Sequence, residues 1–267
     1  MPRRTRLDAE LVRRGLARSR EHASQLIADG RVSVAGTVAL KAATAVGTDA
    51  AVQVRTTDEP DWASRGAHKL LGALAAFAPR GLTVSGRRCL DAGASTGGFT
   101  DVLLRHGVAH VVAVDVGYGQ LAWRLRTDDR VTVRDSTNVR SLTPQHLGGP
   151  VELVVADLSF ISLRLVLPAL VACATADADL LPMVKPQFEV GRQRLGFGGV
   201  VRDSADRADA VLRVLHDARE LGWGLCGVVA SPLPGPSGNV EYFVWLRTDA
   251  DSDAEELVRR AVEEGPA

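Results

Sequence analysis

The chain has 267 residues, of which 46% are hydrophobic and 24% charged, and its formal net charge is zero. This composition is ordinary for a globular protein, and the length allows one sizeable α/β domain with a small additional module. Three widely spaced cysteines exclude a zinc cluster of the usual spacing, and no stretch has the roughly 20 apolar residues of a membrane span or the apolar core of a signal peptide. We expect a cytoplasmic protein without a metal site or a membrane partner.

Residues 1–55 are predicted to form a small basic unit. Helices are expected over residues 7–15 and 19–30, followed by β structure that runs to about Arg55. The first 41 residues contain nine basic and four acidic side chains, a net charge of +5. Such a charge on an otherwise balanced chain suggests an anion-binding module, and a solvated helix surface is the alternative.

The residues that characterise this unit are spread over both helices and the β structure: Arg6-Leu7-Asp8, Leu11, Gly15, Ser19-Arg20, Ala23, Leu26-Ile27, Gly30, Val32, Val34, Gly36 and Lys41. With them, the unit resembles the small RNA-binding domain first known from a ribosomal protein of the small subunit. The resemblance implies that basic side chains dock on RNA phosphates, which positions the RNA without necessarily reading its sequence. The side chains implied are Arg4, Arg6, Arg18, Arg20 and Lys41.

Residues 56–64 (TTDEPDWAS) are polar and contain Pro60, which predicts a linker before a larger domain over residues 65–267. Strands are predicted at residues 88–92, 111–116, 131–135, 152–158, 180–185, 225–230 and 240–247. Helices are predicted at residues 66–77, 98–106, 120–126, 161–174 and 204–221. This alternation predicts a mostly parallel seven-stranded sheet covered on both faces. The last two strands are joined by a segment too short for a crossover helix, so we expect them to be antiparallel.

The sequence CLDAGASTGGFTDVLL, residues 89–104, predicts a strand, a tight glycine turn and a helix. Small residues allow a ligand to approach such a turn, and the helix N-terminus offers free N–H groups. The glycine order differs from the G-x-G-x-x-G of dinucleotide-binding proteins. Asp91 suits the ammonium and sulfonium end of S-adenosylmethionine, directly or through water, better than it suits a pyrophosphate. We therefore favour S-adenosylmethionine over NAD.

Two further acidic residues support an adenosine-containing ligand. Asp115 ends the second strand, 24 residues after Asp91, and can accept both ribose hydroxyls. Asp135 ends the third strand and is placed to reach the adenine amino group. The predicted cofactor-binding residues are Asp91, Gly93, Ala94, Ser95, Thr96, Gly97, Gly98, Phe99, Asp115, Val116, Asp135 and Asp157.

Four charged residues stand out from apolar surroundings. Asp157 and Lys185 end the fourth and fifth strands, Glu241 opens the seventh, and Lys69 lies near the start of the helix before the first strand. Open α/β sheets bind ligands at the carboxyl ends of their strands. Each residue alone is also explained by an ion pair or a solvated charge at an element end.

Together, Lys69, Asp157, Lys185 and Glu241 resemble the Lys-Asp-Lys-Glu tetrad of RrmJ/FtsJ-like ribose 2′-O-methyltransferases. With the amino-terminal unit, and with phrases such as SRGAHKL, DVGYGQLAWRLR, VKPQFEVG and SPLPGPSGNVEYF, nearly the whole chain is similar to the TlyA family of ribosomal RNA cytidine 2′-O-methyltransferases, historically labelled haemolysins. The resemblance implies a Rossmann-like, S-adenosylmethionine-dependent enzyme that methylates ribosomal RNA within ribosomal subunits. The basic start and the helical tail resemble the members that modify both 16S and 23S RNA.

The chemistry of a ribose hydroxyl gives these residues roles. The hydroxyl must be deprotonated or polarised and held in line with the methyl group. Lys185 is the candidate base, or the cation that stabilises the developing alkoxide, and the sequence leaves both roles open. We expect Asp157 to orient Lys185 near the methyl donor, and Lys69 and Glu241 to position the ribose.

The remaining predictions, on RNA contacts, a lid and the function itself, each have an alternative. Arg65 and His68 are predicted RNA contacts, and His68 is equally consistent with an ordinary helix surface. The glycine-rich loop after Lys185, with Arg192 and Arg194, is predicted to be a lid that orders on RNA, with a plain surface loop as the alternative. A noncatalytic RNA-binding assembly factor, a membrane-active haemolysin, and a methyltransferase for a small molecule or protein are the competing functions.

Overall fold

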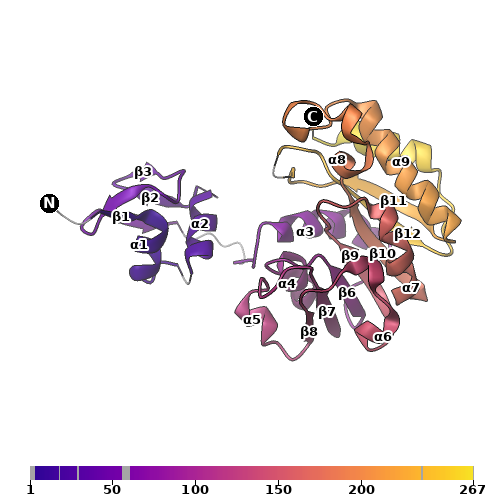
Figure 1. Ribbon diagram of the computed structural model, residues 1–267, viewed down its shortest axis with the longest axis horizontal. Coiled ribbons are helices and arrows are strands. Elements are labelled where there is room, and N and C mark those ends of the chain that lie inside the picture. The colour runs from indigo at the N-terminus through magenta and orange to yellow at the C-terminus, as the bar shows by residue number, and fades with distance from the viewer. Residues whose placement is uncertain (1–3, 18, 29, 56–60, 236, 267) are drawn as a thin grey trace. The chain divides into compact units, whose positions relative to one another are not determined.

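The computed structural model describes residues 4–17, 19–28, 30–55, 61–235 and 237–266. Contacts divide the chain into two compact units, Met1–Asp61 and Trp62–Ala267 (Figure 1). Most of the predicted linker, residues 56–60, lies outside the described residues, as does Arg18. Residues 62–64 pack on the larger unit: the Trp62 ring lies under the Arg105 guanidinium at 4.4 Å, and the Ala63 N–H donates to Asp101 Oδ2 at 2.8 Å.

The smaller unit packs two helices against short antiparallel strands. Its elements are β1 (Arg4–Arg6), α1 (Leu7–Arg13), α2 (Arg20–Ala28), β2 (Val32–Val34), β3 (Thr37–Val38), β4 (Ala45–Gly47) and β5 (Val52–Val54). The strands form two small sheets, β1–β4 and β3–β2–β5. Leu11 of α1 and Ile27 of α2 are buried in the common core. The Ser19 hydroxyl accepts from the His22 N–H at 3.1 Å, as expected of a residue that caps α2.

The larger unit is built on one seven-stranded sheet with the order β11-β12-β10-β9-β6-β7-β8. The strands are β6 (Arg88–Ala92), β7 (His110–Val114), β8 (Val131–Arg134), β9 (Val151–Ala156), β10 (Ala174–Val184), β11 (Gly224–Ala230) and β12 (Tyr242–Arg247). The five strands from β10 to β8 are parallel, and β12 is antiparallel to both β10 and β11. The predicted sheet is confirmed, including its antiparallel final pair.

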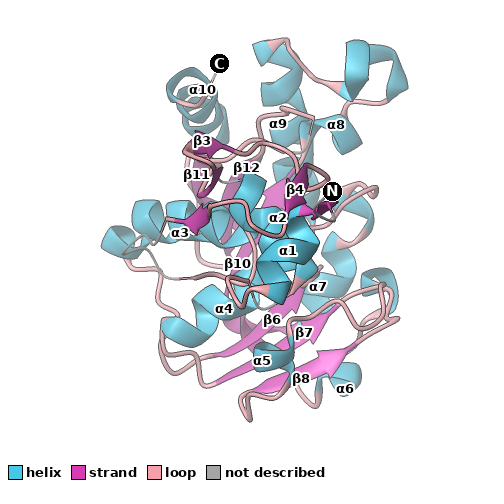
Figure 2. Ribbon diagram, turned by 90° about the vertical axis from the view of Figure 1, so that its left-hand side faces the viewer, coloured by secondary structure: helices cyan, strands magenta, loops and turns pink. Residues whose placement is uncertain are grey.

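Helices cover both faces of this sheet (Figures 1 and 2). They are α3 (Gly66–Phe77), α4 (Gly98–Arg105), α5 (Trp123–Arg126), α6 (Pro144–Leu147), α7 (Leu167–Cys173), α8 (Pro186–Glu189), α9 (Ser204–Glu220) and α10 (Ala254–Glu264). Neighbouring strand residues alternate between two buried clusters: Leu90 packs with α7 and α9, and Cys89 packs with α3 and α4. A sheet buried on both faces holds its strand ends rigidly, which suits it to position a site.

Two boundaries differ most from the prediction, each by six residues. The predicted helix over residues 161–174 begins only at Leu167, preceded by a 3₁₀ turn at Leu163–Leu165, because Pro168 favours the first turn of a helix. Strand β10 begins at Ala174, six residues early, with an irregular register up to Asp179. The first residues of β10 are mostly polar or small, which hid this part of the strand. Its buried Asp179 carboxylate accepts from Trp245 Nε1 at 2.5 Å, and this hydrogen bond offsets the cost of burying the acid.

Candidate active site

The carboxyl edge of the sheet brings together the predicted catalytic residues. Asp157 follows β9 directly, and Lys185 follows β10 at the start of α8. Glu241 precedes β12, where Tyr242 lies opposite Val184 of β10. Because β12 runs antiparallel to β10, its beginning lies beside the end of β10, and all three side chains reach the same edge.

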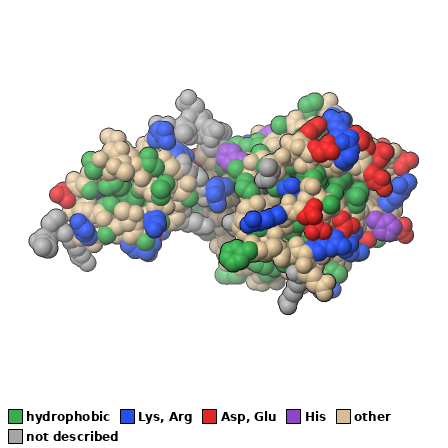
Figure 3. Space-filling view, turned by 90° about the horizontal axis from the view of Figure 1, so that it is seen from above, with side chains coloured by type: hydrophobic (Ala, Val, Ile, Leu, Met, Phe, Trp, Pro, Cys, Tyr) green, Lys and Arg blue, Asp and Glu red, His purple; other side chains and the backbone are tan. Residues whose placement is uncertain are grey.

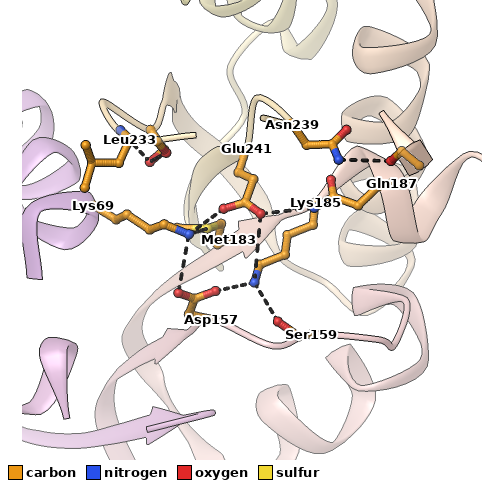
Figure 4. Close-up of polar contacts among 11 residues, drawn as sticks. Lys69, Asp157, Ser159, Met183, Lys185, Gln187, Leu233, Asn239 and Glu241 are labelled. Carbon is orange, nitrogen blue, oxygen red and sulfur yellow. Dashed lines mark hydrogen bonds and ion pairs between the residues drawn. The ribbon is translucent and has the colours of Figure 1, made fainter. Parts of the chain in front are cut away.

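Lys69 reaches this edge from the first turn of α3 and completes a closed network of charges (Figure 4). Its Nζ lies 2.6 Å from Glu241 Oε2 and 3.8 Å from Asp157 Oδ2. The Nζ of Lys185 lies 2.5 Å from Asp157 Oδ1 and 4.0 Å from Glu241 Oε1. Each carboxylate therefore faces both ammonium groups, and two positive charges balance two negative ones.

The network is largely shielded from water. Glu241 is fully buried and Lys185 is 6% exposed, whereas the Asp157 side chain is 20% exposed. Burying a charge is costly unless a counter-charge is buried with it, so the four side chains stabilise one another. Gly235 leaves space for the Glu241 carboxylate, because a Cβ at position 235 would lie 2.5 Å from Glu241 Oε1.

Two polar residues of the network were missed by sequence reasoning. Ser159 Oγ accepts from Lys185 Nζ at 3.0 Å, and Gln187 Nε2 donates to Glu241 Oε1 at 3.1 Å. Each follows a network residue by two positions, Ser159 after Asp157 and Gln187 after Lys185. This spacing could have identified them, because a polar residue two positions after a strand-end residue still lies at the same edge of the sheet.

A pocket of about 430 Å³ opens next to the network. Its lining comes from the loops that follow β6, β7, β8 and β9: Gly93, Ser95, Asp115, Val116, Gly117, Gln120, Asn138, Val139, Asp157, Leu158, Ser159, Phe160, Ile161 and Val166. Asp157 belongs to both the lining and the charge network. The pocket and the network are therefore parts of one site.

Two residues shape the pocket floor. Gly93 has φ +87°, and a Cβ there would lie 2.6 Å from the Asp157 carbonyl oxygen, so only glycine permits β6 and β9 to leave the sheet this close together. Asp115 accepts from the Ser95 N–H at 2.8 Å and from the Gly117 N–H at 2.7 Å, one with each carboxylate oxygen. Each oxygen keeps a further lone pair for a hydroxyl.

Asp91, predicted to face the methyl donor, is fully buried beneath the glycine turn and is not part of the pocket lining. Its Oδ2 accepts from Thr100 Oγ1 of α4 at 2.6 Å, and its Oδ1 has no hydrogen-bond partner among the described residues. Burial raises the pKa of this carboxyl to about 7. Asp91 therefore lies beneath the turn, and its role toward the methyl donor stays a prediction.

Several other predicted cofactor residues also lie outside the lining. Asp135 accepts from Arg126 Nη2 at 2.5 Å, a hydrogen bond that lowers its pKa. Phe99 packs in the core against Phe243, with ring centroids 5.9 Å apart. Gly97 permits close packing against Leu125. The residues in this group are Asp91, Ala94, Thr96, Gly97, Gly98, Phe99 and Asp135.

The predicted RNA contacts that the structure describes lie in both units. In the smaller unit Arg4 and Lys41 are exposed, and Arg6 and Arg20 share contacts with Asp8. Figure 3 shows Lys and Arg side chains of this unit reaching the surface at several separate points. In the larger unit, exposed Arg65 immediately precedes α3, and half-buried His68 lies one residue before Lys69.

The loop after Lys185 is anchored at two points. Arg194 pairs with Asp206 and Asp209 of α9, at 3.2 and 2.5 Å. Asn239 Oδ1 accepts from the Val201 N–H at 2.9 Å, and its Nδ2 donates to the Gly199 carbonyl at 3.0 Å. These contacts hold the loop against α9 and Asn239, and its ordering on RNA stays a prediction.

Within the described ranges, no helix is both long and apolar enough to cross a membrane. The same residues contain no group of His, Cys, Asp or Glu side chains arranged to hold a metal ion.

Comparison with known proteins matches both units. Residues 62–248 match the FtsJ-like methyltransferase family, and residues 5–52 match the S4 domain. The chain is 63% identical, over the full length of both chains, to the 16S/23S rRNA (cytidine-2′-O)-methyltransferase TlyA of Mycobacterium tuberculosis. It is 34% identical to Hemolysin A of Brachyspira hyodysenteriae, over 89% of this chain and 98% of that one. A solved Streptococcus thermophilus structure that carries a hemolysin name is 35% identical, covers 99% of this chain and 97% of its own, and has a TM-score of 0.75.

Proposed function

The chain belongs to the FtsJ-like methyltransferase family, together with its TlyA relatives, and from this premise we propose that it methylates cytidine 2′-hydroxyls of 16S and 23S ribosomal RNA. The methyl donor is S-adenosylmethionine, the substrates are ribosomal subunits, and the reaction takes place in the cytoplasm. The observation that carries this proposal is the closed network of Lys69, Asp157, Lys185 and Glu241 at the mouth of a pocket that shares Asp157.

The residues around the pocket fit S-adenosylmethionine. Gly93 lets the turn after β6 lie close against Asp157 in the pocket lining, and Asp115 offers two carboxylate oxygens to the paired hydroxyls of a ribose. The apolar side chains of Val116, Val139 and Ile161 provide surfaces for an aromatic base. When bound, S-adenosylmethionine supplies a methyl group that its sulfonium already activates. Asp157 links the end of the pocket to the charge network.

The network residues act on the acceptor oxygen. Asp157 and Ser159 contact the Lys185 ammonium, and Glu241 at 4.0 Å lies beyond hydrogen-bond distance, which leaves one of its three donor positions for a ribose O2′. There the Lys185 ammonium polarises the hydroxyl and stabilises the negative charge that develops on O2′, while the hydroxyl proton passes to water at the partly exposed Asp157. Lys69 holds Glu241 in place at 2.6 Å, so the cation keeps its position without reorganisation.

The test is transfer of labelled methyl groups to isolated 30S and 50S subunits, with ribose methylation mapped on each RNA. Lys185→Ala should lower the rate at least about 100-fold while S-adenosylmethionine binding, measured by calorimetry, stays close to wild type. Wild-type turnover in this variant would refute the role of Lys185. Subunit binding by the wild-type protein without methyl transfer would instead favour a noncatalytic assembly factor.

A further inference from the structure

Asp8 lies under Arg6 and Arg20, two of the arginines predicted from the sequence to dock on RNA. The residue is 3% exposed, at the start of α1. Its carboxylate accepts from Arg6 Nε at 3.1 Å and Nη2 at 2.8 Å, as a two-pronged fork, and from Arg20 Nη2 at 3.1 Å. One buried acid therefore holds side chains from β1 and α2 together.

The two arginines remain open to solvent. Their side chains are 52% and 61% exposed, compared with 5% for Asp8. Within the described part of the chain, Nη1 of Arg6 and both Nε and Nη1 of Arg20 have no acceptor. The hydrogen bonds from Arg6 lower the pKa of Asp8 to about 2, so the carboxylate is charged at any physiological pH. The group presents donor N–H groups outward and keeps a net positive charge.

Glu10 forms a second group two residues further along α1, in which Arg13 is exposed like Arg6 but Arg14 is not. Glu10 is fully buried and contacts Arg13 at 2.5 Å and Arg14 at 2.7 Å. Arg14 is only 20% exposed and also donates to the carbonyls of Ala50 at 2.7 Å and Thr48 at 3.0 Å. The donors of Arg14 are thus used inside the unit. Among the residues that the structure describes, the arginines held by Asp8 have no such internal partners.

We propose that Asp8 is a positioning residue for RNA binding, which holds Arg6 and Arg20 side by side so that their free N–H groups bind backbone phosphate. This inference rests on the proposed function, because it assigns the phosphates to ribosomal RNA. A guanidinium fixed before binding loses less freedom on contact than one on a free side chain, so preorganisation strengthens binding. The cost is one negative charge beneath an anion-binding surface.

Asp8→Asn separates positioning from net charge, because the two effects change the affinity for RNA in opposite directions. Removal of a negative charge alone should tighten binding to phosphate. Loss of the charged fork should instead weaken it, because a neutral amide holds the arginines less firmly. We expect the full-length variant to bind isolated 30S and 50S subunits about tenfold more weakly. The slope of log affinity against log salt concentration should fall by about one.

Asp49→Asn is the matched control. Asp49 is an exposed acid of the same unit, and its substitution makes the same change in charge. Affinity should stay within about twofold of wild type, or tighten. Thermal unfolding of both variants separates a loss of folded protein from a loss of affinity, and a merely structural role of Asp8 would leave the salt slope unchanged.

Arg6→Lys keeps the proposal testable if Asp8→Asn does not fold. Lysine retains the charge but cannot form the fork with Asp8, so binding should weaken severalfold. The inference is overturned if Asp8→Asn or Arg6→Lys binds as tightly as wild type, or if Asp49→Asn weakens binding equally. A wild-type protein that neither binds nor methylates subunits overturns the proposed function, and this inference with it.

Discussion

Both units of this protein bury carboxylates beside positive side chains, but they leave the cations in different surroundings. In the larger unit Lys185 and Glu241 are both withdrawn from water. In the smaller unit Asp8 is buried while Arg6 and Arg20 remain more than half exposed. A shielded cation is fixed in a medium of low polarity, where it acts strongly on one oxygen. An exposed cation can meet a large, charged surface, so we propose that the same pairing serves chemistry in one unit and docking in the other.

The largest predicted effect comes from opening the shielded network. Glu241→Ala removes the fully buried partner of Lys69, leaves an excess of buried positive charge, and should cost about 3 kcal/mol of unfolding free energy. Methyl transfer should fall with it, and Glu241→Gln should lose activity with a smaller loss of stability. Urea unfolding and methyl-transfer rates measure both effects. Unchanged stability in Glu241→Ala would show that water reaches the charged groups of the network more freely than their burial indicates.

Asp91 tests what burial does to a carboxyl group whose hydrogen-bond donor is a neutral hydroxyl, that of Thr100. Its pKa is raised from 3.8 to about 7 by burial, so the unfolded chain loses this proton before the folded protein does. The protonated Asp91 contributes its full share of the unfolding free energy below pH 3.8. As pH rises from there toward 7, that contribution falls by about 1.4 kcal/mol for each pH unit. The difference in unfolding free energy between wild type and Asp91→Asn, followed from pH 4 to 8, should show this slope. A flat difference would place the charged form of Asp91 in the folded protein.

A smaller effect is expected where a buried acid ties two loops of the site. Glu189 of α8 accepts from Ser162 Oγ and from the Leu163 N–H, each at 2.6 Å, and thereby joins the segment after Lys185 to the segment after Asp157. Burial raises the pKa of Glu189. Glu189→Ala should cost about 2 kcal/mol and lower kcat severalfold, whereas Glu189→Gln can keep both hydrogen bonds. Equal kinetics in the two variants would argue against a positioning role.

The smallest effect should come from a pair that is exposed on both sides. Glu256 of α10 meets Arg259 at 2.7 Å, and both side chains are at least half exposed. Water competes for such a pair, so Glu256→Gln should leave unfolding and methyl transfer within experimental error of wild type. A measurable loss here would mean that burial does not distinguish the charge clusters of this protein.

The sheet and the charge network were predictable because their signals are local. Apolar runs marked the strands, and Asp157, Lys185 and Glu241 each interrupted an apolar run at a strand end. The topology then required strand ends to meet at one edge. The match to the FtsJ-like family agrees with the tetrad resemblance that the sequence carried.

Features that depend on side-chain direction were not predictable. Asp91 sits in the glycine motif, but the alternation of β6 turns its side chain away from Leu90 and toward Thr100 of α4. Strand β1 has the sequence Arg-Thr-Arg, with no apolar residue to mark it. The fork between Arg6 and Asp8 could be guessed from their spacing, but Arg20 joins it only because α2 packs beside α1.

The reversed direction of β12 has a consequence for synthesis. It brings Glu241 to Lys69 from 172 residues further along the chain, whereas every residue that lines the pocket lies between positions 93 and 166. A nascent polypeptide that stalled after residue 166 would therefore hold every residue that lines the pocket but only Lys69 and Asp157 of the tetrad. The complete charge network therefore arises late in translation, and premature termination before β12 yields a product that lacks Glu241.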